Sequence, residues 1–191
     1  MKRNKSDRSP SLRGEPVRQR VLDAAERLLR DGRAEFSMRD LAAEAGVSFA
    51  TPFNQFGSKA AIMQALSERR IVTMTELFAA APYLADVTAR VALAVEVAIA
   101  VMLEEPTVNR AVMGWIGSAG PVPGNALERS QGLWALALGP DQEEAGRSAH
   151  NRPQHLALAF RGALSFWSAG EMSDEQFRTA ALGAAKAILS A

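Results

Sequence analysis

The residues with the clearest chemistry lie between Arg39 and Lys59. Asn54 and Gln55 carry side-chain amides, which can form paired hydrogen bonds with adenine, and Phe49 can contact a thymine methyl group. Lys59 stands where a helix is expected to begin, so its ammonium and the helix-end amides together suit a phosphate. This segment therefore predicts recognition of nucleic acid. The candidate contacts are Arg39, Ser48, Phe49, Thr51, Phe53, Asn54, Gln55 and Lys59.

Two short helices are expected to position these side chains. Ser37 and Asp40 have the spacing of a capping box at a helix start. Gly46 supplies a tight turn, and Ser48 is placed to cap the next helix. A longer amphipathic helix precedes them, closed by Gly32. The pattern predicts a helix-turn-helix motif over residues 37–56, inside a three-helix head over residues 16–62.

The rest of the chain also favours helices. Residues 87–104 alternate like a strand, but they are long, rich in alanine and have only helical neighbours, so we expect a buried helix. Asn125 is placed to cap a later helix, and Ser173 opens a second capping box. The sequence predicts an all-α fold of about nine helices, with a second domain over residues 63–191.

Charge is distributed unevenly along the chain. Residues 1–70 carry 14 Lys and Arg against 9 Asp and Glu, whereas residues 71–191 carry 8 against 12. A basic front and an acidic back favour a polyanion at the N-terminal end. Residues 1–15 are expected to be a disordered basic leader, either a solvated tail or an arm that lies along phosphates.

Composition argues against several other classes of protein. The chain has no cysteine, and its two histidines lie five residues apart, so we expect no metal site and no cofactor. No spaced nucleophile–base set or phosphate loop is present, which argues against an enzyme. The longest apolar stretch, residues 91–103, is too short to span a bilayer, and no signal peptide is visible. We therefore expect a cytoplasmic protein.

One combination of features occurs in two segments, VRQRVLDAAERLL and SMRDLAAEAGVSFATPFNQFGSK. In order along the chain, they contain a helix, a capped helix, an AGVS corner, a threonine, an aromatic residue and Ser-Lys. Over residues 17–70 this combination resembles the DNA-binding domain of the TetR family of bacterial transcriptional regulators. The segment GALSFWSAGEMSDEQF is similar, more loosely, to the end of that family's ligand-binding domain.

The sequence departs from the family pattern at four places. Phe53 stands where the family usually has a tyrosine that often touches a phosphate, and Gln55 stands where histidine is common. Ala60 and Ala61 follow Lys59 where a glutamate is common. Pro52 lies inside the expected recognition helix, which predicts a later start or a distortion of that helix.

Specific binding by one such head usually requires a second head on a neighbouring half-site, hence a dimer. Small and aromatic residues in the last two helices either form the dimer interface, called the seam below, or fill the monomer core. The resemblance favours a four-helix homodimer interface. The candidate interface residues are Gly162, Phe166, Trp167, Phe177, Ala181, Ala184 and Ile188.

The resemblance also implies a small, largely apolar ligand bound in the second domain. Glu96 lies within an apolar helix, where it faces solvent, pairs with an arginine such as Arg161, or meets a cationic ligand. The candidate lining residues are Phe78, Glu96, Met102, Met113, Trp115, Trp134 and Phe160.

The function implied is a dimeric regulator that binds a double-stranded DNA operator and acts as a repressor released by its ligand. The alternative is a helical ligand- or partner-binding protein whose head no longer reads DNA specifically.

Overall fold

The structure, a computed structural model, describes residues 15–116, 125–140 and 151–190. These ranges contain nine α-helices and no strand, which confirms the all-α prediction. None of the described helices combines the length and the apolarity that crossing a bilayer requires. The chain divides into two compact units, Met1–Ile62 and Met63–Ala191.

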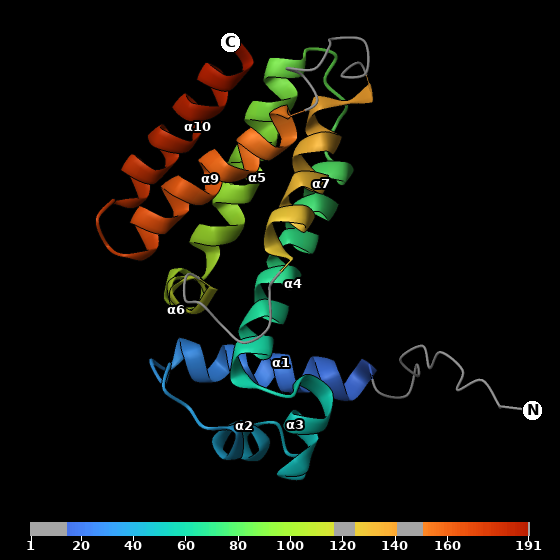
Figure 1. The fold of residues 1–191 in the computed structure, drawn as a ribbon, viewed down its shortest axis with the longest axis vertical. Coiled ribbons are helices and arrows are strands. Elements are labelled where there is room, and N and C mark those ends of the chain that lie inside the picture. Colours follow the sequence, from blue (N-terminus) through green and yellow to red (C-terminus); the bar gives the residue numbers. More distant parts are fainter. Residues whose placement is uncertain (1–14, 117–124, 141–150, 191) are drawn as a thin grey trace, which may run out of the picture. The chain divides into compact units, whose positions relative to one another are not determined.

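The first unit is built on three helices that pack against one another, α1 (Glu15–Arg30), α2 (Met38–Glu44) and α3 (Ala50–Phe56) (Figure 1). Helix α1 begins at Glu15, one residue before the expected start. Its buried residues recur at helical spacing and form one apolar face. They are Val21, Leu22, Ala24, Ala25, Leu28 and Leu29.

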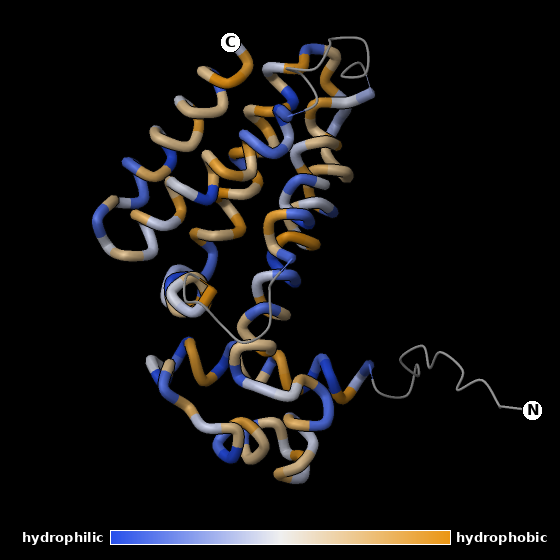
Figure 2. Tube along the Cα trace, viewed as in Figure 1, coloured by the Kyte–Doolittle hydropathy of each residue, from blue (hydrophilic) through white to orange (hydrophobic). Residues whose placement is uncertain are grey.

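A long helix, α4 (Lys59–Ala80), begins in the first unit and continues in the second. The second unit further contains α5 (Val87–Glu104), α6 (Pro106–Ile116), α7 (Ala126–Leu138), α9 (Arg152–Ser168) and α10 (Asp174–Ser190). Helix α9 packs against α6, α7 and α10, and α5 packs against α6, α7 and α10. Hydrophobic and hydrophilic stretches alternate along most of these helices in Figure 2, as expected where one face is buried.

Helix α5 resolves the ambiguous pattern of residues 87–104 in favour of a helix. Asp86 caps it, because its carboxylate accepts a hydrogen bond of 2.7 Å from the Ala89 amide. Val91, Val95 and Met102 are buried at helical rather than alternating positions. Burial against helices on more than one side explains why this sequence is apolar beyond one face.

Arg90 of α5 is a buried cation that the sequence analysis did not single out. Its guanidinium donates to the carbonyls of Leu84, Ala85, Ala137 and Leu138 at 2.8–3.0 Å. Two of these carbonyls belong to the last turn of α7, whose oxygens have no partner within the helix. Gly139 has φ +80°, and a Cβ there would lie 2.8 Å from Arg90 Nη2. Arg90 thus joins α5 to the end of α7.

The predicted helix caps have different outcomes. The second capping box is present, since the Ser173 amide donates to Gln176 Oε1 at 2.8 Å and the Gln176 amide donates to Ser173 Oγ at 3.2 Å. The prediction for Asn125 is wrong: it stands at the N-cap of α7, but its side chain makes no capping hydrogen bond. Its ψ of 21° lies outside the extended region that N-cap residues typically adopt.

Candidate nucleic-acid interface and candidate ligand cavity

The turn between α2 and α3 is fixed by local hydrogen bonds. Ser37 Oγ accepts from the Asp40 amide at 3.1 Å, and the Ser37 amide donates to Asp40 Oδ2 at 2.8 Å, which completes the predicted capping box. Gly46 has φ +63°, and the Val47 amide returns to the Ala42 carbonyl at 3.0 Å. This left-handed corner ends α2 abruptly and sets the direction of the next helix.

Helix α3 starts without a side-chain cap, so the cap predicted at Ser48 is wrong. Phe49 is the N-cap residue and has helical backbone angles, φ −52° and ψ −36°. The Ser48 hydroxyl instead forms a 2.8 Å hydrogen bond with the Thr51 hydroxyl, and the Thr51 amide donates to the Ser48 carbonyl at 2.9 Å. The two hydroxyls are therefore hydrogen-bonded to each other.

Pro52 neither delays nor breaks the helix. Helix α3 begins at Ala50, and Pro52 is its third residue, with a buried ring. The first amides of a helix have no intrahelical acceptor, so the missing N–H of proline removes no helical hydrogen bond here. Its placement in the first turn explains why the predicted later start does not occur.

The exposed face of α3 carries a pair of aromatic rings. Phe49 is 53% exposed and Phe53 is 43% exposed, and their ring centroids lie 5.4 Å apart in an edge-to-face arrangement. The Arg39 guanidinium lies 5.6 Å from the Phe49 ring centroid, and Asn54 is exposed beside the pair. The i, i+4 spacing of the two phenylalanines is the signal in the sequence that indicates this contact.

Thr51 and Gln55 lie at the edge of this face, where both are half-buried. The backbone carbonyl of Gln55 accepts a 3.1 Å hydrogen bond from Arg18, whose guanidinium lies 4.3 Å from the Phe56 ring centroid. Arg18 thereby ties α1 to the end of α3. The side chains predicted to contact bases therefore lie on a helix that α1 holds in place.

Lys59 is engaged within the head. Its ammonium donates to the Ala34 carbonyl at 2.6 Å and lies 4.5 Å from the centroid of the buried Phe36 ring. Burial lowers the pKa of the Lys59 ammonium, although the charge of Glu35 opposes this shift. Lys59 thus joins α4 to the segment before α2, and its contact with phosphate stays a prediction.

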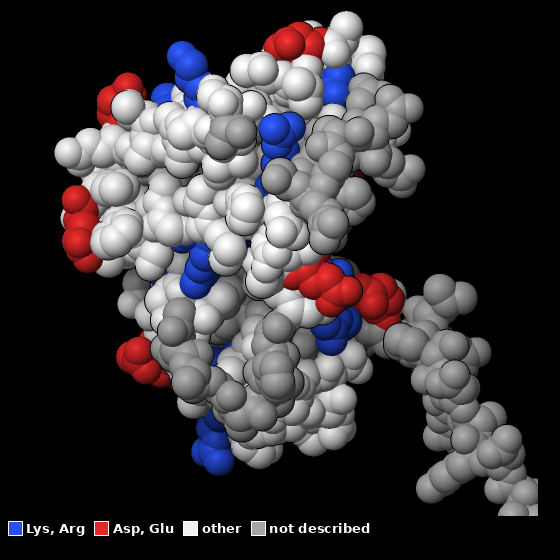
Figure 3. Space-filling view, turned by 45° about the horizontal axis from the view of Figure 1, so that its top comes forward, with Lys and Arg blue, Asp and Glu red and all other residues white. Residues whose placement is uncertain are grey.

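Positive charge is not concentrated in the described part of the head. Residues 15–62 contain seven Lys and Arg and seven Asp and Glu, whereas residues 1–14 contain five basic residues and one acidic residue. On the face shown in Figure 3, the described basic side chains are scattered and form no continuous patch. The basic leader predicted over residues 1–15 lies outside the described residues except for Glu15, which belongs to α1.

The second unit encloses a cavity of about 260 Å³ between α4, α5, α6, α7 and α9. Four of the predicted lining residues contribute to its wall: Met102, Met113, Trp134 and Phe160. Phe78 instead lines a separate cavity of about 560 Å³ with Tyr83 and Arg90. Trp115 belongs to neither wall.

Glu96 lines neither of these two cavities. Its carboxylate forms an ion pair with Arg178 of α10, and both side chains are more than one third exposed. The expected partner, Arg161, lines the cavity instead. Glu96 and Arg178 come from helices that pack together, which explains a pairing across 82 residues of sequence.

Three of the predicted dimer residues fill the monomer core. Trp167 and Phe177 are fully buried and stacked with ring centroids 5.4 Å apart, and Ala181 is 3% exposed. The Trp167 indole donates to Asp174 Oδ1 at 2.7 Å. These side chains are unavailable to a second chain, because α9 and α10 bury them against each other and α5.

The other four predicted dimer residues are accessible to different degrees. Phe166 is 50% exposed, and a Cβ added at Gly162 would meet no atom within 4 Å. Ala184 and Ile188 are half-buried, and Ile188 packs against the core.

Comparison with known proteins identifies the first unit. Residues 21–66 match the family model described as bacterial regulatory proteins, tetR family. A comparison with curated proteins by sequence gave no match.

Similar solved structures extend over nearly the whole chain. A TetR transcriptional regulator from Rhodococcus sp. RHA1 is 19% identical, covers 92% of this chain and 97% of its own, and has a TM-score of 0.77. A TetR-like transcriptional regulator from the same organism is 21% identical, with coverage of 96% and 99% and a TM-score of 0.52. At such identities these likenesses show a shared fold. Together with the family model on the helix-turn-helix, they show that residues 21–66 are similar to a domain of the tetR family of bacterial regulatory proteins and that the chain shares the fold of TetR transcriptional regulators, which supports a DNA-binding transcriptional regulator.

Proposed function

We propose that the chain is a dimeric, sequence-specific repressor that a small molecule releases from its operator. One observation supports this most directly: α3 exposes a face with Phe49, Phe53 and Asn54, which we call the reading face. The capped start of α2 and the hydrogen bond from Arg18 fix the position of this helix in the head. A helix-turn-helix places such a helix in the major groove, where its first residues meet base edges. Residues 15–62 carry as many acidic as basic side chains, which favours base contacts over general phosphate attraction for the described head.

The reading face suits A·T-rich sequence. The Asn54 amide can donate to N7 and accept from N6 of adenine, and thymine presents a methyl group to the apolar rings of Phe49 and Phe53. Phe53 has no hydroxyl, so its side chain cannot donate a hydrogen bond to a phosphate and contributes only apolar contact. Arg39 lies beside the pair, within reach of the sugar–phosphate backbone at the edge of the groove.

The outward faces of α9 and α10 suit the proposed dimer seam. Leu158 and Phe166 are each about half exposed on α9, at 51% and 50%. Gly162 on α9 and Gly183 on α10 leave open space where side chains would stand, so a second pair of helices can approach closely. Large apolar groups beside small ones are typical of packed helical seams.

The cavity provides the proposed route to release. Met74 and Arg70 of α4 line it, and α4 begins in the DNA-binding unit at Lys59. A ligand that favours one position of α4 over another changes the relative stability of the DNA-competent dimer, because both sites are linked through one helix.

Titration of the chain with its own upstream DNA, followed by fluorescence anisotropy at 50 mM and 200 mM salt, tests the proposal. Specific binding that resists random competitor and is weakened by Asn54→Ala, about 1–3 kcal/mol for a paired base contact, supports it. Asp31→Ala, an exposed position after α1, is the control. No specific binding would leave a helical ligand-binding protein whose head does not read DNA.

A further inference from the structure

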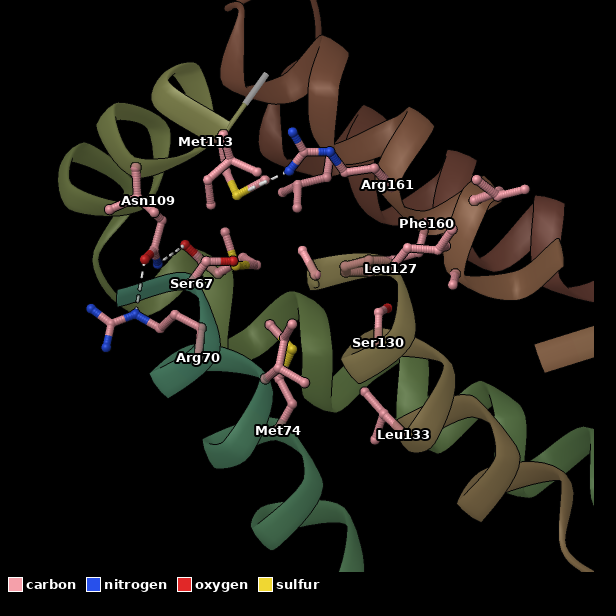
Figure 4. A pocket seen from close by; sticks show the side chains of 18 of the residues that line it. Ser67, Arg70, Met74, Asn109, Met113, Leu127, Ser130, Leu133, Phe160 and Arg161 are labelled. Atoms are coloured by element: carbon pink, nitrogen blue, oxygen red, sulfur yellow. Dashed lines mark hydrogen bonds between the residues drawn. The ribbon is translucent and has the colours of Figure 1, made fainter. Parts of the chain in front are cut away.

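The cavity of about 260 Å³ between α4, α5, α6, α7 and α9 has an apolar wall with a few polar groups, which Figure 4 shows from close by. Met74, Leu133 and Phe160 represent the apolar part. Ser67, Arg70, Asn109, Ser130 and Arg161 contribute nitrogen and oxygen atoms. Ligand cavities of this kind bind through apolar area and select through the few polar groups, so the state of each polar group indicates what the cavity can take.

Most of these polar groups are satisfied within the protein. Arg70 Nε donates to Asn109 Oδ1 at 2.9 Å, and its guanidinium lies 3.6 Å from a carboxylate oxygen of Glu105. The Asn109 amide donates to the carbonyls of Val101 and Met102. Ser130 accepts a 3.1 Å hydrogen bond from the Trp134 indole. These groups shape the wall, and the charge of Arg70 is already balanced.

Arg161 differs from Arg70. Its Nη1 donates to the thioether sulfur of Met113 at 3.4 Å, and no carboxylate pairs with it among the residues that the structure describes (Figure 4). A thioether is a weak acceptor, whereas a guanidinium has five donors and keeps its charge at physiological pH. Burial lowers the pKa of the Arg161 guanidinium, because the charged form loses hydration. A cation that is half removed from water without an anion is costly, and an anion would relieve that cost.

We propose that this cavity binds a small carboxylate with an apolar body, whose carboxylate pairs with Arg161 while the body lies among the methionine, leucine and aromatic side chains. The inference rests on the proposed function in one respect, since it names the class of the releasing ligand. A carboxylate can bind a guanidinium through two parallel hydrogen bonds, which thioether contact cannot match. A cationic ligand would meet the like charge of Arg161 inside an apolar wall.

The volume limits the size of the body. An apolar cavity of about 150 Å³ holds benzene, so about 260 Å³ suits one ring or a medium-length alkyl chain together with a carboxylate. Suitable probes are 3-phenylpropanoate and octanoate. Each has a neutral amide of the same skeleton, and 3-phenylpropylamine supplies the cation.

Isothermal titration calorimetry of the full-length chain at pH 7 tests the inference. We expect each acid to bind about tenfold or more tightly than its amide, the difference that a hydrogen-bonded charge typically makes, and the amine to bind less tightly than the amide. Arg161→Gln should reduce the preference for acid over amide to about twofold or less, and Arg161→Lys should restore part of it. Arg152→Gln, on the same helix but outside the cavity wall, should keep the full preference.

Amide affinity in Arg161→Gln shows whether the cavity is intact, because the amide does not depend on the charge. Equal binding of acid and amide by the unsubstituted chain, a preference that survives Arg161→Gln, or no binding of either acid would overturn the inference. Operator binding is measured separately. Specific operator binding without a preference for acid over amide would support the regulator proposal and refute the ligand class. A preference for acid over amide without specific operator binding would support the ligand class and refute the regulator proposal.

Discussion

Lys59 allows two roles, in the stability of the head and in DNA binding, to be separated by one substitution. Lys59→Met removes the ammonium but keeps a chain that can lie on Phe36. Loss of the 2.6 Å hydrogen bond to Ala34 and of the ring contact at 4.5 Å should destabilise the head by about 1–2 kcal/mol. We take a modest value because Lys59 is only partly buried.

Amide hydrogen exchange measured by mass spectrometry is the appropriate assay. All three tryptophans, Trp115, Trp134 and Trp167, lie in the second unit, so their fluorescence does not report on the head. A loss of 1–2 kcal/mol corresponds to exchange about 5–30 times faster where protection depends on opening of the head. The control is Arg20→Met, which removes a positive charge from an exposed position of α1.

The same variants test the phosphate contact. If Lys59 leaves Ala34 to bind a phosphate, Lys59→Met should reduce the slope of log affinity against log salt by about 0.9, and Arg20→Met should leave the slope nearly unchanged. Unchanged exchange in Lys59→Met would refute the bracing role. An unchanged slope would refute the phosphate role, whichever result exchange gives.

Four further outcomes are expected. Removal of residues 1–14, with five basic residues, should reduce the salt slope by up to about 4–5 if all of them meet phosphates; an unchanged slope would identify a solvated tail. Hydrogen bonds from the Ser37 amide and hydroxyl lower the pKa of Asp40 from its ordinary 3.8. The stabilisation that the ionised carboxylate gives to α2 should therefore be complete above pH 3.8, and it should be lost as the pH falls through the lowered pKa. Exchange of the α2 amides in the unsubstituted chain and in Asp40→Asn should therefore converge at low pH, and a difference that persists would contradict this. Replacing contacted thymines by deoxyuridine should weaken operator binding by about 1 kcal/mol through the lost methyl contact, and Phe49→Ala should abolish that difference; a methyl effect that survives would show that another residue reads it. Phe166→Glu should yield monomers in sedimentation experiments while Leu77→Glu, an equally exposed site on α4, leaves dimers, and dimers in both would exclude the α9 face as the seam.

The DNA-binding head is the part that the sequence predicted most fully. Its elements depend on contacts between near neighbours: the Ser37–Asp40 capping box, the left-handed corner at Gly46 and the helical spacing of α1. Local hydrogen bonds and apolar periodicity of this kind can be read along the chain. The errors are local too. A cap at Ser48 required an extended backbone, and the chain there is already helical at Phe49.

The candidate sites of the second unit could be predicted only in part. Met102, Met113, Trp134 and Phe160 line the cavity, but the same residue types at the same spacing also fill the core, as Trp167 and Phe177 do. Helical periodicity shows that a face is buried and does not show whether a protein side chain or a ligand covers it.

The sequence alone determined the helical class and the position of the helix-turn-helix segment, which matches the tetR family model, because these follow from order and spacing. Only the tertiary structure decided the partner of each charged group. Glu96 pairs with Arg178, Arg90 donates to the end of α7, and Arg161 donates to the Met113 thioether at the cavity wall. Each result depends on helices far apart in sequence that pack together, and electrostatic energy depends on distance and burial, which residue order does not fix.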